Sequence, residues 1–371
     1  MTLVKLILET NALSIKLSRT SNTASILNSL WQSPGVSRID MATKLGLDKS
    51  TVTKAVNHLL DIGMILEQPK AVSGKGGRPK MSLVFNADFG VIIGVDVNSD
   101  VLKVSVVNLL GQVIYHDMLP INTQVSIDTA LIEALVPCVN TIQALFPRIL
   151  AIGIGMPGLI DPDKSQLLVS HSLNIRSSIN FAPLFKRHFP YPVFIDNDAN
   201  CGAWGELMQQ RSLHYDHFLY VLLSTHHAKE HYHQLGIGVG MILNRQLFYG
   251  EQFMAGQFNS QELIRGTEAT PSVIIKEFSA LAVNLCGLMS IRRIVIGGNG
   301  MSFGSELAAS LRNHSDGLSG LLIAKPNIEF SLLGPQAAAM GAASMAWQKL
   351  LTAELKLAES LRLPENGNLS I

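Results

Sequence analysis

The segment Gly74-Lys75-Gly76-Gly77-Arg78-Pro79-Lys80 divides the 371-residue chain into two parts of different composition. It holds three glycines, one proline and three cations but no apolar side chain, so it cannot contribute to a hydrophobic core. We therefore expect a linker or an exposed loop tip. Its positive charge suits it to lie along phosphates or to enter a DNA minor groove, and a solvated connector is the alternative interpretation.

The charge of the chain is distributed unevenly on the two sides of this segment. Residues 1–80 hold 11 lysines and arginines against five acidic residues, a net charge of +6, whereas the remainder carries −5 and the whole chain +1. This asymmetry suggests a nucleic-acid-binding head on a soluble body. The three cysteines lie apart in apolar surroundings, which is typical of reduced thiols in a cytoplasmic protein. No apolar run reaches the ~20 residues of a membrane span, so we expect no membrane contact.

The basic part shows three helical patterns in succession. Apolar residues recur at helical spacing within residues 21–34, and Ser37 can cap a second short helix. Gly46 permits a tight turn into a third helix over residues 49–62. The residues of the second helix that we expect to face inward are Ile39, Ala42 and Leu45.

Two helices around a glycine turn, the second with a cationic and hydroxyl-rich front, are typical of a helix-turn-helix. Residues 64–68 and 80–86 can pair as strands with the 74–79 tip between them, which would form a wing. The sequence therefore predicts a winged helix-turn-helix domain over residues 1–85, with a small helical protein-interaction domain as the alternative. The residues expected to contact DNA are Arg38, Lys49, Ser50, Thr51, Thr53, Lys54, Asn57 and Arg78.

The long remainder alternates strand and helix patterns in two similar halves. The first half has strand patterns at residues 91–97, 102–107, 112–116, 149–154 and 192–195, and helix patterns at 127–146 and from 201 to about 210. The second half has strand patterns at 217–224, 236–243, 293–298 and 327–332, and helix patterns at 271–289 and 336–351. Two such halves predict a clefted α/β protein, in which ligands bind outside the carboxyl ends of the strands.

Six short motifs follow one another along the chain in a specific order. They are Gly-Gly-Arg-Pro (76–79), Gly-Val-Asp (94–96), Gly-Ile-Gly-Met-Pro-Gly-Leu-Ile-Asp (153–161), Asp-Asn-Asp-Ala-Asn (196–200), Gly-Glu (205–206) and Gly-Gly-Asn-Gly (297–300). In this order they resemble the ROK family of sugar-responsive regulators and sugar kinases. The resemblance covers nearly the whole chain. It implies an actin-like/ribonuclease-H-like body with lobes at 86–205 and 206–371, whose C-terminal helix packs back on the first lobe.

The resemblance also implies a sugar or sugar-phosphate effector in the cleft, whose closure controls DNA binding. Asp198 matches the base of the family's kinases and lies beside the sugar-binding Asn197. Asn174 can equally be a simple turn residue. The residues expected to bind sugar are Asn174, Asn197, Asp198 and Gln257.

The phosphate-binding parts of a kinase are altered. The family's Asp-x-Gly-Gly-Thr loop reads Asp-Val-Asn-Ser-Asp at residues 96–100, which removes both glycines and adds the negative charge of Asp100. The second turn, normally Gly-Thr-Gly-Ile-Gly, is interrupted between Thr225 and Gly236 by ten residues. We therefore expect no catalytic residues and no cofactor, and keep an ATP-dependent sugar kinase with an attached DNA-binding head as the alternative.

The zinc motif of the family is also missing. The matching run is Gly-Gln-Phe-Asn-Ser at 256–260, with no cysteine cluster after it, so we expect no metal. A separate histidine group, His226, His227, His231 and His233, places two members on one helix face if it is helical. An exposed polar loop with solvated histidines is the interpretation we favour.

These observations lead to one hypothesis with two competitors. We expect a cytoplasmic transcriptional repressor of carbohydrate genes that binds a double-stranded operator as a homodimer or homotetramer and a carbohydrate effector. The competitors are the sugar kinase and a constitutive DNA-binding protein that has lost its ligand.

Overall fold

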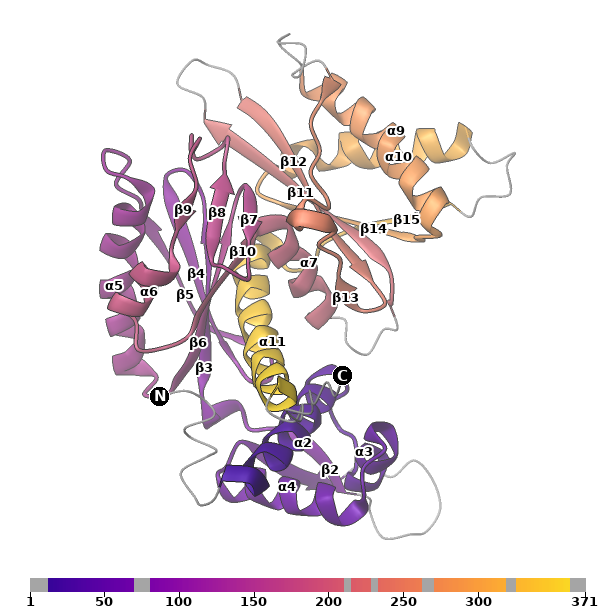
Figure 1. Cartoon of the computed structure of the whole chain (residues 1–371). Coiled ribbons are helices and arrows are strands. Elements are labelled where there is room, and N and C mark those ends of the chain that lie inside the picture. The colour runs from indigo at the N-terminus through magenta and orange to yellow at the C-terminus, as the bar shows by residue number, and fades with distance from the viewer. Residues whose placement is uncertain are drawn as a thin grey trace, which may run out of the picture.

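The computed structural model describes residues 13–69, 81–209, 215–227, 233–261, 270–317 and 325–360. It shows a small N-terminal head beneath a body of two lobes (Figure 1). Arg78, the 74–79 tip and His231 lie outside the described residues.

The head is the winged helix-turn-helix that the sequence predicts. Its elements are α2 (Leu13–Gln32), α3 (Arg38–Leu45), α4 (Lys49–Asp61), β1 (Ile65–Pro69) and β2 (Met81–Phe85). The two strands pair antiparallel, and the apolar stripe of α4 is buried at Val52, Val56 and Leu59. Ser37 caps α3 by accepting a hydrogen bond from the backbone N–H of Asp40, and Gly46 ends it at φ 62°.

One expectation for the head is wrong. The side chain of Ile39 does not face inward but is 62% exposed, whereas Met41 and Ala42 are buried. Ile39 and Met41 are two positions apart, which is about 200° around the helix, so they point to nearly opposite sides and Met41 takes the inward position.

The first lobe contains a five-stranded sheet of order β10-β6-β3-β4-β5. Its strands are β3 (Val91–Val97), β4 (Val101–Asn108), β5 (Val113–Pro120), β6 (Ile149–Met156) and β10 (Val193–Asn197). The first three pair antiparallel, while β6 and β10 add in parallel. Helix α5 (Ile127–Leu145) covers one face of this sheet (Figure 1). Between β6 and β10 the chain forms β7 (Leu159–Asp161), β8 (Gln166–Val169), β9 (Ile179–Asn180) and α6 (Ala182–His188).

The second lobe repeats the plan with a sheet of order β13-β12-β11-β14-β15. Its strands are β11 (Phe218–His227), β12 (His233–Leu243), β13 (Gln246–Leu247), β14 (Arg293–Gly298) and β15 (Asn327–Phe330). Its helices are α9 (Pro271–Met289) and α10 (Gly304–Gly317), of which the sequence patterns predicted only α9. Helix α7 (Asp198–Gln209) joins the lobes and begins three residues earlier than expected, so Asp198 lies in its first turn.

Helix α9 is long and apolar enough, by length and composition alone, to cross a membrane, which the sequence patterns did not indicate. Its buried residues Ile274, Phe278 and Cys286 belong to the apolar core that includes Val221 and Ile294 of the second sheet. It is therefore a core helix of the second lobe.

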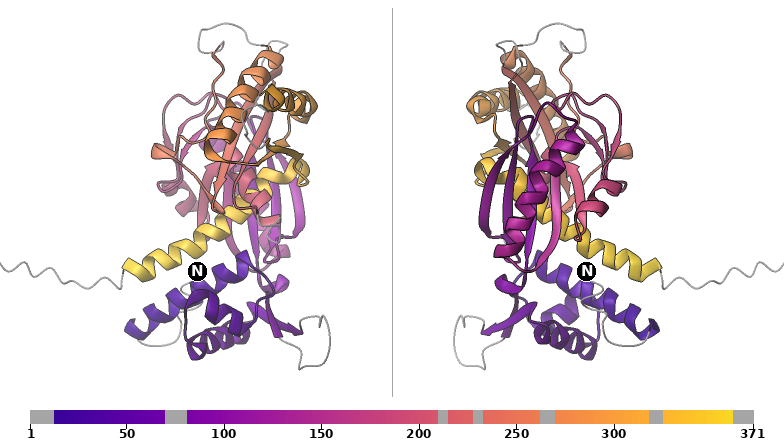
Figure 2. Two further views of the ribbon diagram at one scale, coloured as in Figure 1. Left: turned by 90° about the vertical axis from the view of Figure 1, so that its right-hand side faces the viewer. Right: turned by 90° about the vertical axis from the view of Figure 1, so that its left-hand side faces the viewer.

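The last helix, α11 (Ala337–Ser360), packs on β3 and β6 of the first lobe and on α7. The contact is close because glycines line it. A Cβ atom added to Gly94 or Gly153 of the sheet would lie 1.9 Å from a carbonyl oxygen of α11. A Cβ atom added to Gly341 of α11 would lie 1.6 Å from the carbonyl oxygen of Cys201 on α7. Figure 2 shows α11 running on from the body to lie along α2 of the head.

We predict that Gly153→Ala lowers the free energy of unfolding by about 2–3 kcal/mol, because the new methyl group displaces α11 from the sheet. Urea unfolding followed by circular dichroism measures the change. Gly317→Ala is the matched control, since nothing lies within 4 Å of its added Cβ, and it should stay within about 0.5 kcal/mol. Equal effects of the two substitutions would show that the packing is not close.

Candidate functional site

The outward face of α4 offers cations and hydroxyl groups to solvent. Lys49, Ser50, Thr53 and Lys54 are exposed, and Thr51 is half-buried. These side chains are not covered by the body, and the second helix of such a domain is the one that enters the major groove. The face therefore remains available for DNA.

Two other predicted DNA contacts are held by the head itself. The Nε atom of Arg38 lies 2.7 Å from Oε1 of Glu67 on the wing, and its Nη1 donates to Oδ1 of Asn57 at 2.7 Å. These charge-assisted bonds tie α3, α4 and β1 together. Arg38 and Asn57 therefore position the face of α4, although Asn57 remains exposed at its edge.

A cleft of about 330 Å³, including its open mouth, lies between the lobes where the carboxyl ends of β3 and β14 meet. Its polar lining comes from both lobes and consists of Asp96, Asn98, Lys103, Asp198, Ser224 and Asn299. Loss of hydration and the nearby charge of Asp96 raise the pKa of Asp198 to about 7. Burial likewise raises the pKa of Asp96, although the nearby Lys103 and a hydrogen bond from Asn98 oppose this.

The four predicted sugar contacts have different surroundings. Asn197 is used internally: its Nδ2 donates to the carbonyl of Gly158 at 2.9 Å, and its Oδ1 accepts from the N–H of Ala199. Asp198 lines the cleft beside it. Gln257 is exposed, and its backbone forms a bridge with Gly238 of β12. Asn174 is exposed in a turn with φ 53°, a conformation that asparagine tolerates well, and this supports its interpretation as a turn residue.

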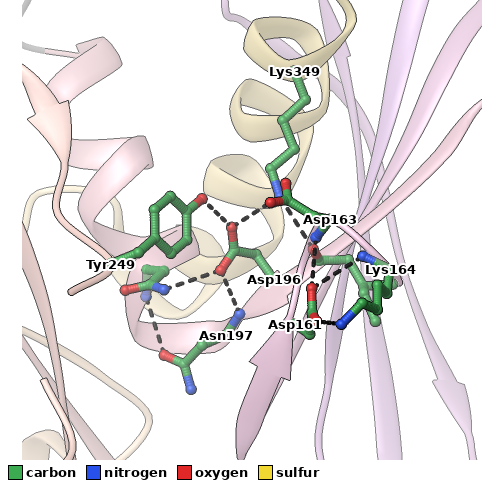
Figure 3. A network of polar contacts seen from close by, with 9 residues as sticks. Asp161, Asp163, Lys164, Asp196, Asn197, Tyr249 and Lys349 are labelled. Atoms are coloured by element: carbon green, nitrogen blue, oxygen red, sulfur yellow. Dashed lines mark hydrogen bonds and ion pairs between the residues drawn. The ribbon is translucent and has the colours of Figure 1, made fainter. Parts of the chain in front are cut away.

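A third carboxylate, Asp196, lies behind these residues and was not among the predicted site residues. It is 1% exposed, and its Oδ2 accepts from Tyr249 OH at 2.6 Å and lies 3.2 Å from Nζ of Lys349 (Figure 3). Its Oδ1 accepts from Nδ2 of Asn200 and from the N–H of Asn197. The network joins β10, the second lobe and α11. In the sequence only the Asp-Asn-Asp run pointed to it, because its partners lie far along the chain.

Protein side chains bridge the cleft between the residues that follow β3 and those that follow β14. Asn299 Nδ2 donates to Asn98 Oδ1 at 3.4 Å across the cleft, and Asn299 Oδ1 accepts from the N–H of Thr225.

Gly240 of β12 lies against α7, since an added Cβ would be 2.5 Å from the Ala199 carbonyl. This glycine therefore serves the contact between a strand and a helix.

The histidine group is not helical where the structure describes it. His226 and His227 belong to β11, and His227 pairs with His233 in the ladder with β12. The interruption in the phosphate turn thus lengthens a hairpin, in which Ser224 still faces Gly236. The alternative of a shared helix face concerned His227 and His231, and it stays a prediction because His231 lies outside the described residues. Among the described residues no group of three or more His, Cys, Asp or Glu side chains could hold a metal ion.

The arrangement is thus a winged-helix head joined to a clefted body of the sugar-kinase type. Residues 92–259 match the model of the ROK family, and residues 20–75 match that of the MarR family. The chain carries a ROK domain behind a MarR-like winged helix, and the family resemblance seen in the sequence is confirmed.

Several proteins of known role are similar. The xylose repressor of Bacillus subtilis (strain 168) is 30% identical over 239 residues, which cover 62% of this chain and 58% of the relative. The DNA-binding transcriptional dual regulator NagC of Escherichia coli (strain K12) is 24% identical over 246 residues, covering 66% and 58%. The chain thus matches less than two thirds of the length of these relatives.

Solved structures share the fold. A ROK family transcriptional regulator, a homolog of the E. coli MLC protein, has a TM-score of 0.64 at 18% identity and covers 92% of this chain and 99% of its own. A ROK family glucokinase from Streptomyces griseus has a TM-score of 0.52 at 18% identity, covering 70% and 100%. Both confirm the predicted fold class of the body, and the first extends over most of the chain.

We predict that Asp198→Asn stabilises the protein at pH 8 but not at pH 4. The folded protein holds the Asp198 proton up to about pH 7, whereas the unfolded chain releases it near pH 3.9, so the ionised carboxylate destabilises the fold progressively between these values. The gain should be roughly 1–3 kcal/mol at pH 8, measured by urea unfolding across the pH range. A difference between the two proteins that does not vary with pH would contradict the raised pKa.

Proposed function

We propose that this protein is a DNA-binding transcriptional repressor of carbohydrate-metabolism genes, controlled by a sugar in the cleft between its lobes. The observation that carries the proposal is the joining of an exposed cationic helix face to a sugar-kinase-like cleft whose carboxylate, Asp198, is kept. The names of the similar proteins, a xylose repressor and NagC, support it. Such a regulator acts in the cytoplasm, where the three buried free thiols stay reduced.

We propose that the head reads a palindromic operator as part of a homodimer or homotetramer, because a two-fold protein places two recognition helices in successive major grooves. The proposed contacts to bases and phosphates come from Lys49, Ser50, Thr51, Thr53 and Lys54, and Arg78, which lies outside the described residues, stays a predicted contact. Arg38 and Asn57 contribute chiefly by holding this face in place.

The effector that fits the cleft best is a neutral sugar. Among the described residues, the lining offers a single cation, the buried Lys103, and this cation already lies near the carboxyl group of Asp96, so a doubly charged phosphate would find little charge compensation. Asp198 offers a carboxylate to a sugar hydroxyl, with Asn197, Gln257 and Asn174 as the further proposed contacts. D-xylose is the first sugar to test, since several similar proteins are named for it.

An ATP-dependent sugar kinase is the second candidate. The raised pKa of Asp198, about 7, is suited to a general base, which favours this activity. The Asn98–Asn299 contact opposes it, because it lies in the loop that binds phosphate in the kinases. A coupled assay of ATP consumption decides: sugar-dependent turnover that Asp198→Asn abolishes would establish the kinase and overturn the repressor as sole function.

We predict that Lys54→Ala weakens operator binding about 3- to 10-fold near 0.15 M salt. The slope of log affinity against log salt should become shallower by about one, because one phosphate is no longer neutralised by the protein. Fluorescence anisotropy with a duplex selected from a random library measures both quantities. The matched control is Lys186→Ala, an exposed lysine on α6 of the body, which should change neither. If the two substitutions behave alike, α4 is not the DNA-binding face.

We predict that D-xylose raises the melting temperature of the full chain and that its affinity increases with pH up to about 7. A sugar hydroxyl donates to the ionised form of Asp198, so binding below the raised pKa must first release the proton of this carboxyl group. The affinity should therefore fall by up to about tenfold for each pH unit below about 7. Calorimetry at pH 6, 7 and 8 measures this. Asp198→Ala should remove binding, while a panel of sugars without any thermal shift would favour a constitutive DNA-binding protein.

A further inference from the structure

Within one turn, helix α11 contacts both the head and a buried carboxylate that lies behind the cleft. Lys349 reaches the buried carboxylate of Asp196, whereas the two residues before it contact the head. Gln348 Nε2 donates to Oδ1 of Asn28 on α2 at 3.1 Å, and the Trp347 ring meets that of Trp31 edge to face at 5.7 Å. Because successive side chains of a helix are 100° apart, Trp347 and Lys349 point to nearly opposite sides.

The head end of this contact is tightly packed. Trp347, Trp31 and Phe85 form a triangle of rings with centroids 5.7 to 6.0 Å apart, and both tryptophans are almost fully buried. Trp31 belongs to α2 and Phe85 to the wing strand β2, so α11 is part of the core of the head. A displacement of α11 at this point must therefore move the head or open a cavity.

The cleft end is polar and shared by both lobes. Asp196 is the second-last residue of β10 in the first lobe and precedes Asn197, whereas Tyr249 comes from the second lobe, eight residues before Gln257. Both Tyr249 OH and the ammonium group of Lys349 contact the same oxygen, Oδ2 of Asp196. A relative movement of the lobes that displaces Tyr249 thus changes the surroundings of the oxygen that holds α11.

We propose that Tyr249, Asp196 and Lys349 are the coupling contact through which occupancy of the cleft is passed to the head, with α11 as the rigid element between them. Lys349 is a positioning residue: it does not line the cleft, and it acts by fixing α11 relative to β10. Its second contact, the Ile195 carbonyl at 3.4 Å, gives the ammonium group an alternative acceptor when Asp196 is rearranged. The proposal rests on the proposed function, because it supposes that the cleft binds a sugar.

The first test uses Lys349→Met in the full chain, with hydrogen exchange of α2 as the readout. Asp196 keeps its bonds from Tyr249, Asn200 and Asn197, so the variant is expected to fold. Saturating D-xylose should change α2 exchange at least about threefold in the parent and not in the variant, while the calorimetric Kd stays within about threefold. Lys349→Arg should restore the response. The same xylose-induced change in Lys349→Met would overturn the proposal.

The second test needs no sugar and separates this proposal from the proposed function. Lys349→Met and Tyr249→Phe should each alter α2 exchange in the unliganded protein by about threefold or more. The matched control is Lys325→Met, which removes an exposed lysine–aspartate pair with Asp316 on the second lobe and should leave α2 unchanged. If no sugar binds but the two substitutions alter hydrogen exchange of α2, the proposed sugar sensing is refuted and the proposed coupling contact is supported. If α2 is indifferent to both substitutions, the coupling is refuted whatever the cleft binds.

Discussion

The close approach of α11 to the first lobe is the constraint on which the rest of the structure depends. Gly94 and Gly153 in the sheet leave no room for even a methyl group between the strands and the helix. Helix and sheet therefore move together, because close-packed interiors do not deform continuously. Since Trp347 of the same helix lies in the core of the head, the DNA-binding domain is joined to the body by packing as well as by the chain.

Under the proposed function, a kinase-like cleft serves as the receptor for a sugar. Asp198 stays at the amino end of α7 with a pKa near 7, but Lys103 supplies a fixed cation beside Asp96. The contact of Asn98 with Asn299 joins the lobes with the protein's own amide groups. A cleft arranged in this way can discriminate sugars by hydroxyl contacts without the binding of nucleotide phosphates.

The side chain of Arg38 pre-organises the head, because its ion pair and its hydrogen bond connect α3, α4 and β1. Arg38 connects the helix before the turn with Asn57 of α4 and Glu67 of the wing. A bond of this kind at the edge of a recognition face fixes the direction of α4 relative to β1, so fewer conformations have to be restricted when DNA binds. In the proposed complex with DNA, the exposed cations Lys49 and Lys54 add attraction to the phosphates.

Local patterns in the sequence determined the elements of this protein. Helical spacing and a glycine turn predicted α3 and α4, alternation of strands and helices predicted two lobes, and the order of glycine and Asp-Asn-Asp motifs pointed to the ROK fold. Tertiary structure decided which groups meet. Asp196 and Tyr249 are 53 residues apart, and Asn98 and Asn299 are 201 apart, so no local periodicity relates them. Ile39 was misjudged for the same reason: whether a side chain fits inward depends on the partner surface, which only the folded chain supplies.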